Sequence, residues 1–414
     1  MGLRVFNLKQ EATYGTSNTD FDFTQQVTSG NAKLGDEPIL RQSGSRMNKY
    51  ARPGAMKPVA EVNGDVDLKR IGHYYKAFLD NYTFTDGGAD QNTHEFWGQE
   101  GTELTSFTGE MTFDSFKKTL VGMLLDELNF EISDEFMSFE SSWIYKTETA
   151  ADITPSEYTQ KYLDGDIPVA FYDVALKVDG ADAPGVVREF KQEMKNNLNQ
   201  DSSIGLGARG PQVKAIAQAR EIELSFNTTL TSGTLDLILA AEYGKANATA
   251  PQNCSLYELP LQFDISFCED LIADNMTILF PKCVFSVEYE ASESDEIEAE
   301  FKLQTLGTGQ ATKVDGTKVV TDIYVKLEND MPEINSTAYG TSTVSLTFSG
   351  GSATEVTLTN TISGTEYEAS ISSNAATVSS VPFGKYTISL DEGTPTPKTI
   401  YVNKATESRT ITVA

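Results

Sequence analysis

Hydrophobic and polar residues alternate along much of the chain, which predicts strands joined by turns. Residues 59–68 alternate as a strand, and the apolar residues of 71–79 then recur at helical spacing. A strand region follows at about 103–113, and residues 121–147 read as a long hairpin with one apolar face. The apolar residues of that hairpin are Leu128, Phe130 and Ile132 on its first strand and Met137, Phe139, Trp143 and Tyr145 on its second.

The second half of the chain partly repeats this scheme. Residues 221–226 alternate as a strand, 235–243 have helical spacing, 256–267 form another strand, and 281–307 form a second long hairpin. Residues 186–198 suit either a strand with polar gaps or a helix face, and we favour the strand. The order strand, helix, strand, long hairpin therefore occurs twice.

The two ends of the chain differ from this middle part. Residues 1–58 have little regular pattern and are rich in Gly, Ser, Asn and Pro, so we expect an N-terminal arm and loops there. Residues 329–342 read as a linker, and short Thr- and Val-rich strands with Gly turns follow it. This indicates a mainly β protein with two domains, at 1–334 and 335–414, the second a small β-sandwich.

The charge of the chain argues against some classes of binding partner. The 414 residues carry a net charge of −28, with 32 Lys and Arg against 60 Asp and Glu. The last 80 residues hold four basic and six acidic residues, so they carry −2 and the first 334 carry −26. Binding to DNA and to anionic membranes depends on Lys and Arg. A domain this acidic is therefore expected to bind neither DNA nor an anionic membrane. The longest apolar run is far shorter than the ~20 residues that span a bilayer.

No arrangement of residues indicates catalysis. The two histidines, His73 and His94, show no ligand spacing with the cysteines, and we expect the first to pack beside a helix and the second to lie in a loop. Cys254, Cys268 and Cys283 have no paired spacing and are expected to be reduced. We therefore predict no enzyme activity, no cofactor and no metal.

The stretch GLGARG at residues 205–210 matches the glycine pattern of a dinucleotide-binding turn. That turn needs a buried strand before it and a helix after it, whereas the residues before this stretch are polar. Residues 211–220 could form a helix, but a strictly alternating strand follows them. We interpret GLGARG as a mobile glycine loop between two strands that binds no nucleotide.

The polar face of the hairpin 121–147 is acidic and carries no Lys or Arg. Alternation places Glu127, Glu131 and Glu140 on the side opposite the apolar residues. Such a face could line an aqueous channel, as alternating strands do in closed barrels. It could also be the ordinary solvent face of an antiparallel sheet.

Three segments resemble the major tail (tail tube) proteins of long-tailed bacteriophages. The first is Glu11-Ala-Thr-Tyr-Gly-Thr16, which is similar to the E-x-T-x-G-T opening of that family. The second is Gly64-Asp-Val-Asp-Leu68 before an amphipathic helix, and the third is the polar, Gly-rich loop at 196–211. The resemblance spans most of residues 1–330. The stretch 380–388, SVPFGKYTI, resembles a strand of Ig-like or carboxypeptidase-regulatory sandwich modules.

The resemblance implies a β-sandwich or barrel-like subunit with long hairpins and one or two short helices. Such subunits form rings, typically hexameric, that stack into a tube in the virion tail after assembly in the host cytoplasm. Partners would be further copies and other tail proteins (terminator, tape measure, distal tail), with DNA passing through on ejection. Glu127, Glu131 and Glu140 would then face the lumen, and GLGARG would be an inter-strand loop ordered by a neighbouring subunit. The alternative is a surface or adhesion protein of two β-domains, against which the lack of a signal-peptide pattern counts.

Overall fold

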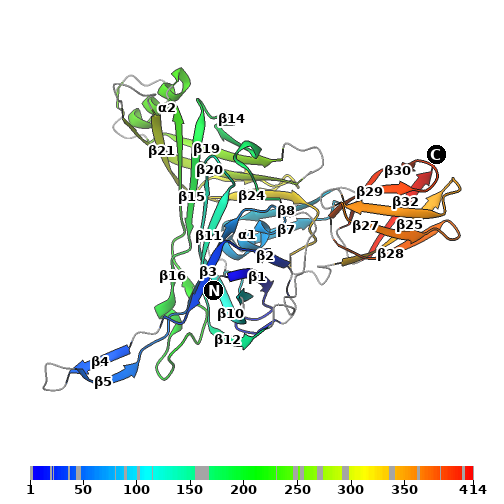
Figure 1. The fold of residues 1–414 in the computed structure, drawn as a ribbon. Helices are drawn as coiled ribbons and strands as arrows, with labels where there is room; N and C mark the ends of the chain where they lie inside the picture. The colour runs from blue at the N-terminus through cyan, green and yellow to red at the C-terminus, as the bar shows by residue number, and fades with distance from the viewer. Residues whose placement is uncertain are drawn as a thin grey trace.

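The structure is a computed structural model that describes residues 3–18, 21, 23–35, 38–42, 48–79, 81–87, 91–99, 103–113, 115–153, 167–229, 231–245, 250–251, 256–267, 274–290, 298–334, 341–360, 364–382, 384–402 and 406–413. The chain is mainly β, with two α-helices among these residues (Figure 1).

One strand, β10 (Phe116–Ile132), joins two antiparallel sheets that together close a barrel. The first half of β10 lies in the smaller sheet, whose strand order is β2 (Phe23–Gln26), β1 (Leu3–Gln10), β9 (Phe107–Phe113), β10 and β12 (Thr147–Asp152). Its second half lies in the larger sheet, ordered β3 (Ser29–Lys33), β6 (Val59–Asp65), β11 (Ser138–Ile144), β10, β15 (Val187–Lys195), β18 (Glu221–Thr229), β21 (Glu298–Thr305) and β20 (Asn275–Glu290).

Strand β20 also carries two side branches. The first consists of β19 (Glu258–Ser266), β13 (Val174–Val178) and β14 (Ala181–Asp182). The second consists of β24 (Tyr324–Asn329), β8 (Asn92–Trp97) and β7 (Asn81–Thr85). Both predicted long hairpins are present, because β10 pairs with β11 and β20 pairs with β21.

Helix α1 (Ile71–Leu79) fills the barrel, and all of its residues except Lys76 are buried. Its aromatic side chains pack on the inner face of the larger sheet. Tyr74 lies 4.8 Å from Phe139 between ring centroids, and Tyr75 lies 5.7 Å from Phe130. The helix thereby anchors the apolar faces of both strands of the first long hairpin.

A buried carboxylate fixes the place where β10 passes between the two sheets. Gly122 has a φ of 72°, a conformation that glycine adopts without strain, and the register of β10 shifts on both sides of it. The carboxylate of Glu11 accepts hydrogen bonds from the Gly122 amide at 2.7 Å and from the Gly15 amide at 2.7 Å. It also accepts bonds from the Ser106 and Thr108 hydroxyls, both at 2.9 Å. The E-x-T-x-G-T segment thus ties β1, β9 and β10 together.

Helix α2 (Ser232–Tyr243) lies at one end of the larger sheet. Thr231 caps it by accepting a bond from the Thr234 amide at 3.2 Å, and Gly244 ends it with a left-handed φ of 72°. This helix confirms the helical spacing predicted at 235–243.

The structure departs from the sequence prediction in two places in the first domain. Residues 1–58 were expected to form an arm and loops, but β1, β2 and β3 are strands of the sheets, and Phe6 and Leu8 are fully buried. Their pattern is weak because polar partners such as Asn7 are buried too. Residues 81–85 and 92–97 form β7 and β8, which the sequence pattern did not predict. Residues 211–220, for which a helix was left open, contain none.

Part of the N-terminal segment does leave the body of the domain. Strands β4 (Pro38–Gln42) and β5 (Asn48–Pro53) pair only with each other among the described strands. They project from the end of the molecule opposite α2 (Figure 1). Four very short strands complete the list for this domain: β16 (Leu198–Asn199) with β17 (Ile216–Ala217), and β22 (Gln310–Thr312) with β23 (Lys318–Val320).

The C-terminal residues form two four-stranded sheets. One is ordered β28 (Ala375–Pro382), β25 (Thr341–Ser349), β32 (Thr406–Val413) and β30 (Pro395–Thr396); the other is β27 (Glu366–Ser370), β26 (Glu355–Asn360), β29 (Gly384–Leu390) and β31 (Thr399–Val402). The short strands predicted after residue 342 are therefore present. The start of the predicted linker is packed, because Met331 and Ile334 are buried in the hydrophobic core.

Candidate functional site

The outer face of the larger sheet is a continuous polar wall. On β11, the second half of β10, β15, β18 and β21, buried residues that pack on the core alternate with residues that point the other way. We call the charged side chains of this outer face the acidic wall. Its members are the glutamates Glu127, Glu131, Glu140, Glu189, Glu193, Glu221, Glu223, Glu298 and Glu300 and the basic residues Arg188, Lys191, Lys195 and Lys302.

The three glutamates expected on one face do lie together on this wall. Glu127 and Glu131 are four residues apart on one face of β10 with Asn129 between them, and Glu140 on β11 stands directly opposite Asn129. Glu131 and Glu140 are exposed, and Glu127 is partly buried. The alternation that buries Leu128 and Phe130 therefore places all three carboxylates on the solvent side of the sheet.

The neighbouring strands add lysines that the hairpin alone does not contain. Glu131 faces Lys191 of β15, with 3.3 Å between the carboxylate and the ammonium nitrogen, and Lys191 also lies 2.7 Å from Glu189. On β21, Lys302 lies 3.0 Å from Glu288. The hydrogen bonds that Lys191 donates to Glu189 and that Lys302 donates to Glu288 raise the pKa of both lysines, so the lysines stay charged. Arg188 also lies 2.6 Å from Glu298, so the wall carries nine glutamates against four basic residues.

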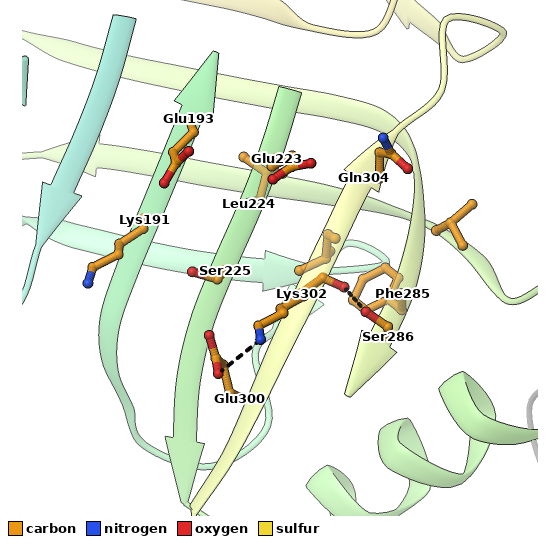
Figure 2. A pocket seen from close by; sticks show the side chains of 12 residues that line it. Lys191, Glu193, Glu223, Leu224, Ser225, Phe285, Ser286, Glu300, Lys302 and Gln304 are labelled. Atoms are coloured by element: carbon orange, nitrogen blue, oxygen red, sulfur yellow. Dashed lines mark hydrogen bonds and ion pairs between the residues drawn. The ribbon is translucent and has the colours of Figure 1, made fainter. Parts of the chain in front are cut away.

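The centre of the wall is a shallow hollow of about 600 Å³. Figure 2 shows Glu193, Glu223, Lys191, Lys302 and Glu300 rising from three adjacent strands around it. Glu193 and Glu223 are direct cross-strand neighbours, a like-charge pair that is destabilising within an isolated sheet. Lys195 lies 3.8 Å from Glu193 and offsets part of this repulsion.

The signal for these further wall residues was present in the sequence. Residues 221–226 alternate strictly, so Glu221 and Glu223 could have been placed on a polar face. What the sequence did not supply was the order of the strands, which brings β15 and β18 beside the hairpin.

A second group of charges lies buried at the segment GDVDL. Lys69 pairs with Asp330 at 3.1 Å, and Arg70 pairs with Asp67. Asp274 accepts a bond from Gln91 at 3.0 Å beside this group. Burial and the charge of Asp330 raise the pKa of Asp274 to about 7. The Lys69–Asp330 and Gln91–Asp274 contacts join segments that are distant in the sequence, whereas Arg70–Asp67 is a local pair.

The residue types that might have indicated catalysis have structural roles. His73 packs in α1 as expected, whereas His94 lies in β8 and not in a loop, with 3.1 Å between Nε2 and the carbonyl oxygen of Met331. Burial lowers the pKa of His94 to about 4, so it is neutral. Cys283 is a buried thiol, and Cys254 and Cys268 fall outside the described residues. No three His, Cys, Asp or Glu side chains gather as a metal site in the described ranges.

The GLGARG stretch is a loop against the base of the β4–β5 hairpin. The Met56 amide donates to the carbonyl of Arg209 at 2.5 Å, and Arg209 Nε donates to the carbonyl of Gly54 at 3.2 Å. Leu206 at its tip is fully exposed. The interpretation of GLGARG as a loop is confirmed, and contacts within the chain hold one side of this loop.

Comparison with known families decides which kind of protein has this wall. Residues 3–263 match the family of phage tail tube proteins, which covers more than half of the chain and most of the barrel. The chain belongs to the phage tail tube protein family. This tail tube protein is thus a structural component of the virion tail, and its family self-assembles and associates with other tail components. Membership of a structural family indicates a non-enzymatic role.

No curated protein matches the chain. Among the helices that the structure describes, none is both long and apolar enough to cross a membrane.

Proposed function

We propose that this chain forms rings, of hexameric symmetry as is typical of such subunits, that stack into the tail tube through which phage DNA is ejected. The observation that supports this most directly is the acidic wall. It is one face of a sheet whose other face is buried in the core, and it belongs to a tail tube protein.

The acidic wall lines the lumen in this proposal. In a ring, symmetry repeats each glutamate around a confined space, which concentrates negative potential there. DNA phosphates are then repelled by the wall and not retained on it, because retention depends on Lys and Arg neutralising phosphates. Glu127, Glu131 and Glu140 are the candidate lumen-facing residues, and each wall lysine lies beside at least one glutamate.

The C-terminal sandwich is an Ig-like decoration module of this tube in the same proposal. Its two sheets bury their own apolar residues, including Val344, Leu358 and Ile388, and it follows the segment that closes the first domain. Assembly would take place in the host cytoplasm, with the terminator, tape measure and distal tail proteins as further partners.

Electron microscopy and sedimentation of the purified full chain test this function. We expect rings and tubes with an open channel, formed in greater number as the protein concentration rises. A chain that stays monomeric at every concentration, and also in the presence of its tail partners, would contradict the proposal.

A further inference from the structure

A lysine and an aspartate are in contact inside the first domain, almost without access to water. The Nζ atom of Lys69 lies 3.1 Å from the Oδ2 atom of Asp330, and each side chain is 3% exposed. The other carboxylate oxygen of Asp330, Oδ1, is buried and has no hydrogen-bond partner among the described residues. Removing two charges from water is costly, and a carboxylate with one unpaired oxygen recovers only part of that cost.

Hydrogen bonds fix the backbone on both sides of this pair. The Asn329 side-chain amide donates to the carbonyl of Leu68 at 2.8 Å, and the Lys69 amide donates to the Asp67 carboxylate at 2.9 Å. These bonds hold the residue before Lys69 against the residue before Asp330. The amine nitrogen therefore stays within reach of the carboxyl carbon, since groups held ~3–3.5 Å apart need little further movement to react.

A third group beside the pair holds a proton. Asp274 is buried and accepts a hydrogen bond from Gln91 at 3.0 Å. Burial and the charge of Asp330 raise the pKa of Asp274 to about 7, so much of this carboxyl group is protonated at neutral pH. Burial acts to lower the pKa of Lys69, whereas the charges of Asp330 and Asp274 raise it, so the three groups interact as neighbours.

We propose that Lys69 and Asp330 condense to an amide (isopeptide) bond after the chain has folded. The Lys69 ammonium first passes one proton to Oδ2 of Asp330, which leaves an uncharged amine beside an uncharged acid. The amine nitrogen then attacks Cγ of Asp330, the Cγ–Nζ bond forms and the Cγ–Oδ2 bond breaks. Asp274 gives its proton to the departing oxygen, which leaves as water, and regains a proton from the nitrogen. No oxidant or reductant is needed.

Burial is what favours this reaction over an ordinary ion pair. The amide replaces two buried charges by an uncharged group, and the water it releases leaves the interior. The chain contains a matched pair in a wetter place. Lys177 lies 2.7 Å from Asp264, which is closer, but these side chains are 34% and 21% exposed. Water hydrates both of those charges, so this pair should remain an ion pair.

The position of the bond gives it a mechanical role. It would join positions separated by 261 residues of chain, and it lies directly after β24 and ahead of the C-terminal sandwich. A force applied to the sandwich would reach Asp330 before it reaches β24. The covalent bond would carry that force to the start of α1, so β24 would not be peeled from the barrel.

Intact mass spectrometry of the denatured full chain tests the bond, after incubation of the folded chain at neutral pH until its mass is constant. We expect the wild type to be lighter than its sequence mass by one water molecule, and its digest to contain a branched peptide that links Lys69 to Asp330. K69R keeps the positive charge but has no reactive amine, so it should keep its full mass. D330N should lose ammonia in place of water and reach the same final mass as the wild type.

Two comparisons separate the bond from other causes. A wild-type chain that keeps its full mass, or that loses water without yielding the branched peptide, overturns the proposal. A link between Lys177 and Asp264 as well would contradict the role of burial. D274N should form the bond more slowly, and an unchanged rate would refute the role of Asp274.

The wild-type peptide decides the matter even where a variant fails to fold. None of these measurements depends on ring formation, so the bond and the proposed function are tested separately.

Discussion

The carboxylate of Glu11 accepts a 2.7 Å hydrogen bond from the Gly122 amide, across 111 residues of chain. This bond holds the point at which β10 leaves the smaller sheet and enters the larger one. The position of the acidic wall relative to the N-terminal strands therefore depends on one buried side chain.

We expect E11A to destabilise the first domain by at least about 3 kcal/mol, because four donors lose their acceptor and an unsatisfied buried polar group costs ~1–3 kcal/mol. E11Q, which keeps one carbonyl oxygen, should lose less. Urea unfolding followed by Trp fluorescence measures this, since Trp97 and Trp143 both lie in the first domain. A change below about 1 kcal/mol for E11A, as for an ordinary surface substitution, would contradict this role.

The buried group around Asp274 predicts a pH dependence of stability. Its pKa of about 7 in the folded chain lies above the ordinary value near 4, because of burial and the charges of Asp330 and Asp67, which Lys69 opposes. Between about pH 4 and 7 the folded state holds a proton that the unfolded state has released, so this contribution to stability is lost as pH rises.

The variant D274N should remove that loss, so the wild type should weaken relative to D274N as pH rises from about 4 to 7. Asp264 is the matched control of opposite sign. Burial acts to raise its pKa, but bonds from Lys177, Gln262 and Thr277 lower it overall. D264N should therefore be less stable than the wild type at neutral pH, with the difference shrinking below about pH 4. Parallel stability profiles for D274N and the wild type would show that Asp274 titrates normally.

Truncation tests where the first domain ends. Ile334 is buried and its amide donates to the Tyr82 hydroxyl at 3.1 Å, and Asn329 donates to the Leu68 carbonyl at 2.8 Å. We expect a chain ending at residue 335 to fold and assemble, and a chain ending at 328 to lose folding cooperativity in urea. Failure of the longer chain to assemble would show that the C-terminal sandwich is part of the assembling unit.

Reversing the charge of the acidic wall should slow the ejection of DNA through the tube. In E127K/E131K/E140K the added lysines stand beside Lys191, which loses its partner Glu131. Exposed charges cost the fold little, so rings should still form, and DNA ejection should slow at low salt and recover as salt screens the phosphates. The control E355K/E366K/E368K changes the same number of charges on the C-terminal sandwich. Unchanged ejection by the wall variant would show that the wall charge has no role in DNA passage.

The alternation of hydrophobic and polar residues was enough to predict the strands that have one solvent-exposed face and one buried face. It correctly placed Leu128 and Phe130 inward and Glu127 and Glu131 outward, because side chains alternate strictly along a strand. Alternation did not predict β1 and β8, because Asn7, His94 and Glu95 are polar but buried there. Each of them is hydrogen-bonded to a residue that is distant in the sequence. Such partners exist only once the barrel has closed.

The wall could be predicted only in part for a related reason. The sequence identified one hairpin and its acids, but Lys191, which pairs with Glu131, comes from β15. The neighbours of a strand are set by topology, which periodicity does not encode.

A cryo-electron microscopy map of tubes assembled from the full chain tests the central claim most directly. The account predicts that the face bearing Glu127, Glu131 and Glu140, with Glu193 and Glu223 beside it, forms the wall of the channel. A map that places these carboxylates on the outer surface of the tube, or buries them in contacts between subunits, would contradict it.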